Sequence, residues 1–166
     1  SDDFIHVHYK NFESVTRVED ISHEIARQAL IMHDIKNKVA ITFKADTPAG
    51  TGLGSSGACA VAVMKGLSAF RGNKMSNKSA AEQSFKLTRA LELPDGVQDP
   101  YVCSLGGFVV LEIDKNGDIK IKKPKIEQKT VTKFFNNSLF YYTGVVRESK
   151  HILAEQNQTK ILESKH

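Results

Sequence analysis

Apolar and polar positions alternate in residues 4–9, and this alternation predicts a strand with one apolar face. After Asp20 the apolar side chains recur at helical spacing, so a helix is expected to follow. Residues 39–45 are rich in β-branched and aromatic side chains, which predicts a second strand. The apolar positions that support these elements are Ile5, Val7, Tyr9, Ile21, Ile25, Ala29, Leu30, Val39, Ile41 and Phe43.

Two helices are predicted in the middle of the chain. Residues 55–70 are apolar on nearly every side, which indicates a buried helix. A second helix is expected to begin near Ser76 or Ser79 and to end at about Leu91, because Ser79 and Glu82 have the spacing of a capping box.

The second half of the chain returns to strand patterns. A short helix or loop is expected over residues 98–105, and a hairpin over 108–121 with a type I′ turn at Asn116 and Gly117. Another strand at 139–142 and a helix at 147–156 complete the pattern. Because these strands do not alternate regularly with helices, the sequence predicts an α+β fold and not a doubly wound one.

Composition narrows the class of protein. The 166 residues are 40% hydrophobic and 25% charged, which fits one domain, or part of one, with a sizeable core. No apolar run approaches a membrane span, and no signal peptide is visible. The net charge of +4 comes largely from lysines at 115–133, which lack the interleaved aromatics of a nucleic-acid surface and are expected on a solvated strand face.

Cys59 and Cys103 lie in apolar surroundings, so both are expected to be buried thiols, as in a reducing cytoplasm, with a disulfide or a nucleophile as the alternatives. The six histidines form no metal-binding pattern. His6 and His8 share one strand face at a spacing that metal ligands can have, but solvent exposure is the expected role.

A glycine-rich loop after Pro48 carries most of the chemical information. Residues 50–57 alternate glycines with small side chains and lead into the helix at 55, where backbone N–H groups can hold a phosphate and the serines can cap the helix. The lysine of a P-loop is absent. The spacing of Gly52, Gly54 and Gly57 also fits a dinucleotide-binding turn, but that fold needs a second parallel strand after the helix, and here another helix is expected instead. A purely structural turn is a further alternative.

The segment from Pro48 to Ala58 resembles the phosphate-binding motif of the GHMP kinases, the family of galactokinase, homoserine kinase, mevalonate kinase and phosphomevalonate kinase. The resemblance implies that the loop binds ATP and that the Ser56 hydroxyl is a ligand of Mg²⁺. The implied ATP-binding residues are Pro48, Gly50, Thr51, Gly52, Leu53, Gly54, Ser55 and Ser56.

Residues 96–108 resemble the segment that carries the catalytic aspartate in these kinases, which makes Asp99 the implied catalytic residue. A carboxylate there can orient the acceptor hydroxyl and accept its proton. The alternative role of Asp99 is to cap a short helix. Gly106 and Gly107 are expected to allow tight packing of the next strand and to contact substrate.

Residues 142–156 resemble the branch that contains the D-glycero-D-manno-heptose 7-phosphate kinases. Arg147 can then bind a sugar phosphate through two hydrogen bonds, or it is a surface arginine at a helix start.

The sequence departs from the family pattern in three places. The family's helix glutamate, which helps to hold Mg²⁺, is replaced in the stretch 85–89, whereas Glu82 comes too early and Glu92 too late. The family's N-terminal strand and its C-terminal glycine-rich motif are missing from the chain. We therefore expect residues 1–156 to form an N-terminal ATP-binding domain, incomplete at its N-terminus, and residues 157–166 to lead to an absent C-terminal domain. Such a fragment is expected to turn over poorly alone.

The resemblance implies the N-terminal domain fold of the GHMP kinases, which is similar to domain 2 of ribosomal protein S5. It implies ATP- and Mg²⁺-dependent phosphorylation of a sugar or sugar-phosphate hydroxyl in the cytoplasm, and the anomeric hydroxyl of D-glycero-D-manno-heptose 7-phosphate is the candidate. A small-molecule substrate is expected, and neither nucleic acid nor membrane. The alternatives are a non-catalytic nucleotide-binding relative and an NAD(P)-dependent oxidoreductase.

Overall fold

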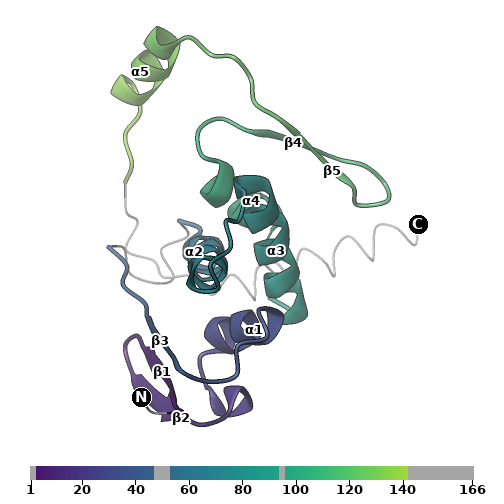
Figure 1. The fold of residues 1–166 in the computed structure, drawn as a ribbon. Helices are drawn as coiled ribbons and strands as arrows, with labels where there is room; N and C mark the ends of the chain where they lie inside the picture. The colour runs from purple at the N-terminus through teal and green to yellow at the C-terminus, as the bar shows by residue number, and fades with distance from the viewer. Residues whose placement is uncertain (1–2, 47–52, 94–95, 142–166) are drawn as a thin grey trace, which may run out of the picture.

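The computed structural model describes residues 3–46, 53–93 and 96–141 (Figure 1). A short 3₁₀ turn at Val18–Asp20 lies between β2 and α1. The elements are β1 (Ile5–His8), β2 (Phe12–Val15), α1 (Glu24–Met32), β3 (Val39–Thr42), α2 (Ser55–Phe70), α3 (Asn77–Ala90), α4 (Gln98–Leu105), β4 (Val110–Ile113), β5 (Ile119–Lys122) and α5 (Gln128–Asn136).

A three-stranded mixed sheet forms the N-terminal part of the fold, in the order β2-β1-β3. The central strand β1 runs antiparallel to β2 and parallel to β3, with Ile5 opposite Val39 and Val7 opposite Ile41. Ile5 and Val7 are fully buried, which confirms the strand predicted from their alternation. β2 was not predicted, because its four residues carry two polar side chains and have little apolar signal of their own.

Helices cover one side of this sheet, and the hydrophobic core lies between the sheet and the helices. α1 contacts α2 and α3, and α2 contacts α3 and α4. Figure 1 shows α1 beside the sheet, with α2, α3 and α4 grouped beyond it. The core side chains come from β1, β3, α1, α2 and α3, and they include Ile5, Val7, Ala29, Leu30, Val39, Val63, Met64, Leu67 and Leu87.

Only one face of α2 is buried. The bounds of the helix agree with the prediction, but Ala58, Ala62 and Gly66 are exposed, so the predicted burial on all sides is wrong. Small apolar side chains gain little free energy from burial and are tolerated on a surface, which is why hydropathy alone misjudged this face.

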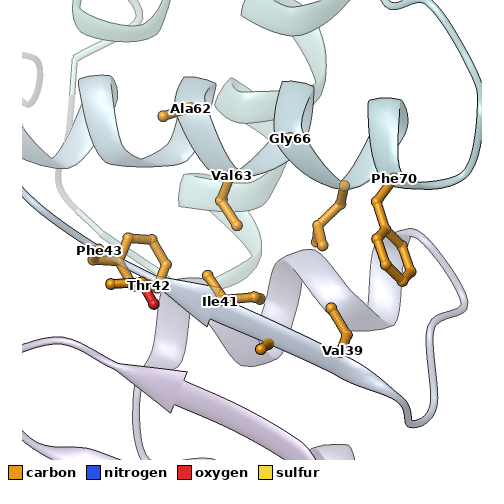
Figure 2. A pocket seen from close by; sticks show the side chains of 10 residues that line it. Val39, Ile41, Thr42, Phe43, Ala62, Val63, Gly66 and Phe70 are labelled. Atoms are coloured by element: carbon orange, nitrogen blue, oxygen red, sulfur yellow. The ribbon is translucent and has the colours of Figure 1, made fainter.

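An apolar groove of about 320 Å³ lies between β3 and α2. Figure 2 shows Val39, Ile41 and Phe43 of the β3 segment facing Val63 and Phe70 of α2 across it. The cavity lining, as far as the structure describes it, contains none of the residues predicted to bind ATP or substrate. Among the described residues, the groove and the predicted site therefore share no side chain.

The first helix begins later than predicted. The 3₁₀ turn ends at Asp20, and α1 starts at Glu24 with His23 as its N-cap. The Nδ1 atom of His23 accepts a hydrogen bond of 3.2 Å from the Ala26 N–H, and the Glu13 carboxylate accepts one of 3.1 Å from the His23 N–H. Side chains distant in sequence thus fix the start of α1.

Acidification is expected to destabilise the fold through His23. Burial lowers the pKa of His23 below its ordinary value of 6.5, so the folded state keeps the ring neutral and able to accept the Ala26 hydrogen bond. The unfolded chain binds the proton more readily. The stability that the neutral ring confers is therefore complete above about pH 6.5 and is lost as the pH falls from there through the lower pKa of the folded state.

His23→Asn keeps an N-cap acceptor and does not titrate. Its thermal midpoint is expected to fall less between about pH 7.5 and pH 5 than that of the wild type, measured by circular dichroism. Equal falls for the two proteins would contradict this role of His23.

Two local predictions can be refined. Of the two starts predicted for α3, Ser76 is confirmed: its hydroxyl accepts a hydrogen bond of 3.1 Å from the Ser79 N–H, and only the capping box at Ser79 is wrong. The β4–β5 hairpin is present, but only Gly117 has a positive φ in its turn, whereas a type I′ turn needs two such residues. Asp114 Oδ1 accepts hydrogen bonds from the Asn116 and Asp118 N–H groups, which stabilises this longer loop.

The chain between 123 and 141 also differs from the prediction. α5 was not predicted, and it carries Lys129 and Lys133, two of the lysines assigned to a strand face. Residues 139–141 form no regular element and their side chains are exposed, so the strand predicted there is wrong over these residues. Tyr142 and the predicted helix at 147–156 lie outside the described residues. Every helix within the described part of the chain is too short or too polar to span a membrane.

Candidate active site

The N-terminus of α2 forms the described half of the predicted phosphate site. Gly54 is the N-cap, in a left-handed conformation with φ of 72° and ψ of 28°, and no side chain caps the helix there. Ser55 and Ser56 lie inside the first turn and are not the N-cap, which corrects the capping role considered for them. Uncapped N–H groups at a helix N-terminus are a ready site for an anion.

Not all of the predicted loop can be placed. Leu53, Gly54, Ser55 and Ser56 are described, and Leu53 is exposed while both serines are half-buried. The other predicted ATP-binding residues lie outside the described residues, and these are Pro48, Gly50, Thr51 and Gly52.

Asp99 lies beside this helix end, although it is distant in sequence. It occupies the first turn of α4, where its N–H donates to the Gly96 carbonyl at 3.3 Å. A Cβ atom placed on Gly54 would lie 3.7 Å from Asp99 Oδ1. The fold therefore brings the predicted catalytic carboxylate next to the predicted phosphate site, with the N-terminal turns of α2 and α4 adjacent.

Cys103 also lies at this site, which the sequence did not predict. It follows Asp99 by one helical turn and is exposed, and its Sγ atom is 4.0 Å from the Gly54 carbonyl oxygen. Cys59, in α2, is half-buried. The prediction of two buried thiols is thus wrong for Cys103, because α4 is too short for its apolar neighbours to define a buried face.

The two thiols are expected to react at different rates. Burial raises the pKa of Cys59 to about 11. Burial and the nearby Asp99 carboxylate raise the pKa of Cys103, which is nevertheless open to solvent. Because the thiolate is the nucleophile, iodoacetamide at about pH 8 is expected to alkylate Cys103 well before Cys59, and faster as the pH rises. Mass spectrometry of peptides at timed intervals measures both rates, and faster labelling of Cys59 would contradict the described exposure.

The stretch at 85–89, where the family glutamate is absent, offers no carboxylate to a metal ion. Thr88 is fully buried, and its hydroxyl donates a hydrogen bond of 3.0 Å to the Phe85 carbonyl of its own helix. Among the described residues, no group of three or more His, Cys, Asp or Glu side chains could hold a metal ion.

Gly106 and Gly107 lie at the opposite end of α4 from Asp99. Their φ angles are 64° and 69°, and a Cβ atom on either would meet nothing within 4 Å. The predicted tight packing is therefore wrong, and these glycines instead allow the positive φ angles that end the helix.

Arg147 lies outside the described residues. His8, on β1, is exposed as predicted, whereas His6 on the same strand is half-buried, so the predicted exposure is wrong for His6.

Comparison with known proteins gives a family match and several relatives. The family profile described as the GHMP kinases N terminal domain matches residues 18–107, which is more than half of the chain. The D-glycero-alpha-D-manno-heptose 7-phosphate kinase of Campylobacter jejuni is 26% identical over 126 residues, which cover 73% of this chain and 37% of that protein. The mevalonate kinase of Thermococcus onnurineus is 34% identical over 76 residues, which cover 46% of this chain and 23% of that protein.

A solved structure shares the fold. The crystal structure of a D-glycero-D-manno-heptose 1-phosphate kinase from Bacteroides thetaiotaomicron superposes with a TM-score of 0.70 at 19% identity, covering 80% of this chain and 47% of that one. The fold predicted from the glycine loop and the strand pattern is thereby confirmed. This chain spans less than half the length of each of these relatives.

Proposed function

This chain belongs to the GHMP kinase family, and from that premise we propose that it supplies the ATP-binding part of a cytoplasmic kinase for a sugar or sugar phosphate. The observation that carries the proposal is the position of Asp99 beside Gly54 at the N-terminus of α2. Phosphoryl transfer places the γ-phosphate of ATP next to the acceptor hydroxyl. An anion site that holds the phosphates and a carboxylate that orients the hydroxyl must therefore lie close together. Residues 1–156 are the proposed domain, and residues 157–166 its connection to the rest of the protein.

In this proposal the chain acts by positioning and electrostatics. The N–H groups from Gly52 to Ser56 bind the ATP phosphates, and the positive end of the α2 dipole stabilises their charge. Asp99 accepts a hydrogen bond from the acceptor hydroxyl, directs its oxygen at the γ-phosphate and takes the proton as the new bond forms. The remaining proposed loop contacts come from Pro48, Gly50 and Thr51.

The residues present fit a Mg²⁺ ion held mainly by the nucleotide. Mg²⁺ in kinases commonly keeps several waters and takes few protein ligands beside the substrate phosphates, so the Ser56 hydroxyl is a sufficient proposed ligand here. When bound, the ion would offset charge on the transferred phosphoryl group.

The proposed acceptor is a phosphorylated sugar, and D-glycero-D-manno-heptose 7-phosphate is the candidate. Two heptose phosphate kinases are among the relatives, which supports this class of substrate. Arg147, Gly106 and Gly107 are the proposed contacts to it, and the net charge of +4 favours an anionic ligand.

A second candidate is a non-catalytic relative that keeps the nucleotide loop. Thr88 favours it, because its hydroxyl is bonded within α3 where the family carries a metal-binding glutamate. The alternative of an NAD(P)-dependent oxidoreductase is not supported, because α2 leads into α3 and not into the parallel strand that a dinucleotide-binding fold needs.

Calorimetric titration separates these candidates. The chain is titrated with a non-hydrolysable ATP analogue, with and without Mg²⁺, and with NAD as the control. The complete natural protein that contains this chain is then assayed for ATP-dependent phosphorylation of sugar phosphates. Mg²⁺-enhanced binding with turnover supports the kinase, whereas Mg²⁺-independent binding without turnover supports the non-catalytic relative. Binding of NAD alone would overturn both.

A further inference from the structure

Gly57 lies at a close approach between the two helices of the candidate site. It is buried in the first turn of α2, and its backbone faces the first turn of α4. A Cβ atom on Gly57 would lie 2.9 Å from both the carbonyl carbon and the Cβ of Asp99, and 3.1 Å from the Pro100 nitrogen. Two of these three atoms belong to backbone, so they cannot move aside as the end of a side chain does.

The other side of α4 is also held in place. The Ser104 hydroxyl donates a hydrogen bond of 2.6 Å to the Asn77 carbonyl at the start of α3. Tyr101 is only 3% exposed, and Pro100 is fully buried. Because α4 packs against α3 as well as α2, it cannot retreat from a larger residue at position 57 without disturbing its contacts with α3.

We propose that Gly57 is a positioning residue, which sets the distance between the Asp99 carboxylate and the phosphate-binding turn of α2. The inference rests on the proposed kinase function. The backbone of Asp99 lies so close to Gly57 that there is no room for a Cβ atom between them, so any increase in the spacing at residue 57 moves the carboxylate relative to Gly54 and the N–H groups beside it. Gly57 itself contacts neither substrate nor nucleotide in this proposal.

The size of the effect follows from the contact distances. Ordinary contact begins at about 3.4 Å, so an alanine at position 57 requires the helices to separate by roughly half an ångström. Displacements on the order of 1 Å at a catalytic group can cost about 10²-fold in rate. We therefore expect Gly57→Ala to lower kcat about tenfold, with KM for ATP nearly unchanged because the loop amides stay on α2.

Gly66→Ala is the matched control. Gly66 lies in the same helix, is exposed, and a Cβ there would meet nothing within 4 Å. Both substitutions replace a helical glycine by a better helix former. Only Gly57→Ala creates a contact with α4, so Gly66→Ala is expected to keep the kcat of the wild type.

The test measures kcat and KM for both variants in the complete natural protein, with D-glycero-D-manno-heptose 7-phosphate as the acceptor, and the alkylation rate of Cys103. A fall in kcat for Gly57→Ala alone, with faster alkylation as α4 moves from Gly54, supports the inference. Wild-type kcat in Gly57→Ala overturns it and leaves the kinase function standing. A wild type that phosphorylates no sugar or sugar phosphate with ATP overturns the proposed function and, with it, this inference.

A second variant covers the case in which Gly57→Ala does not fold. Ser104→Ala removes the hydrogen bond between α4 and α3 and lets α4 yield. The double variant Gly57→Ala, Ser104→Ala is then compared with Ser104→Ala alone. A lower kcat in the double variant supports the positioning role, and equal kcat values overturn it.

Discussion

Asp99→Asn is expected to lower kcat by about 10²- to 10⁴-fold and to leave KM for ATP nearly unchanged. Asparagine has almost the same size, so the close packing of α4 against Gly57 is kept. The asparagine side chain cannot accept a proton from the acceptor hydroxyl, as the Asp99 carboxylate does in the proposal. The charge at the first turn of α4 is also lost, which costs about 0.3–1 kcal/mol of stability, so the folded protein should persist at assay temperature.

Asp118→Asn is the control for this experiment. Asp118 is an exposed carboxylate in the β4–β5 loop, and its backbone, not its side chain, makes the hydrogen bonds to Asp114. Steady-state kinetics of the complete natural protein, with both variants purified alike, measure the effect. Equal turnover in Asp99→Asn and the wild type would remove Asp99 from the chemistry and leave it as a helix-terminal charge.

The parts of this fold that could be predicted from sequence are those with a strong local signal. β1 alternates apolar and polar residues, and α2 has a glycine at its start and Arg71 and Gly72 at its end, so both were predicted at nearly their true bounds. β2 has four residues and depends on its pairing with β1, and the start of α1 depends on Glu13 from β2. Such contacts between distant residues leave no periodicity in the sequence.

In the candidate site, too, local sequence patterns could be predicted and contacts between distant residues could not. The glycine loop and Asp99 could be identified because each lies in a recognisable segment. Their adjacency, the exposure of Cys103 and the contact between Gly57 and Asp99 arise from the packing of α2 against α4. The sequence places a glycine at position 57 but does not say which atoms require it.

Gly54→Ala is expected to raise KM for ATP by about 5- to 30-fold. Gly54 has a φ of 72°, and a left-handed conformation costs an L-residue about 1–2 kcal/mol. If the loop relaxes to avoid this strain, its N–H groups lose their alignment. ATP binding must then supply the roughly 1–2 kcal/mol that restores the strained conformation, which weakens binding by the expected 5- to 30-fold. The new methyl group would also lie 3.7 Å from Asp99 Oδ1, an ordinary contact that adds little further cost.

Gly72→Ala is the control that distinguishes damage to the phosphate-binding turn from the backbone strain that any alanine at a positive φ causes. Gly72 has nearly the same conformation, with a φ of 76°, and a Cβ there meets nothing within 4 Å, but it follows the opposite end of α2. Both variants are expected to lose thermal stability, and only Gly54→Ala is expected to bind ATP more weakly by calorimetry. If the two variants bind ATP equally well, the strain at Gly54 is borne by the fold and not by the loop, and the N-terminus of α2 would not be the place where the phosphates bind.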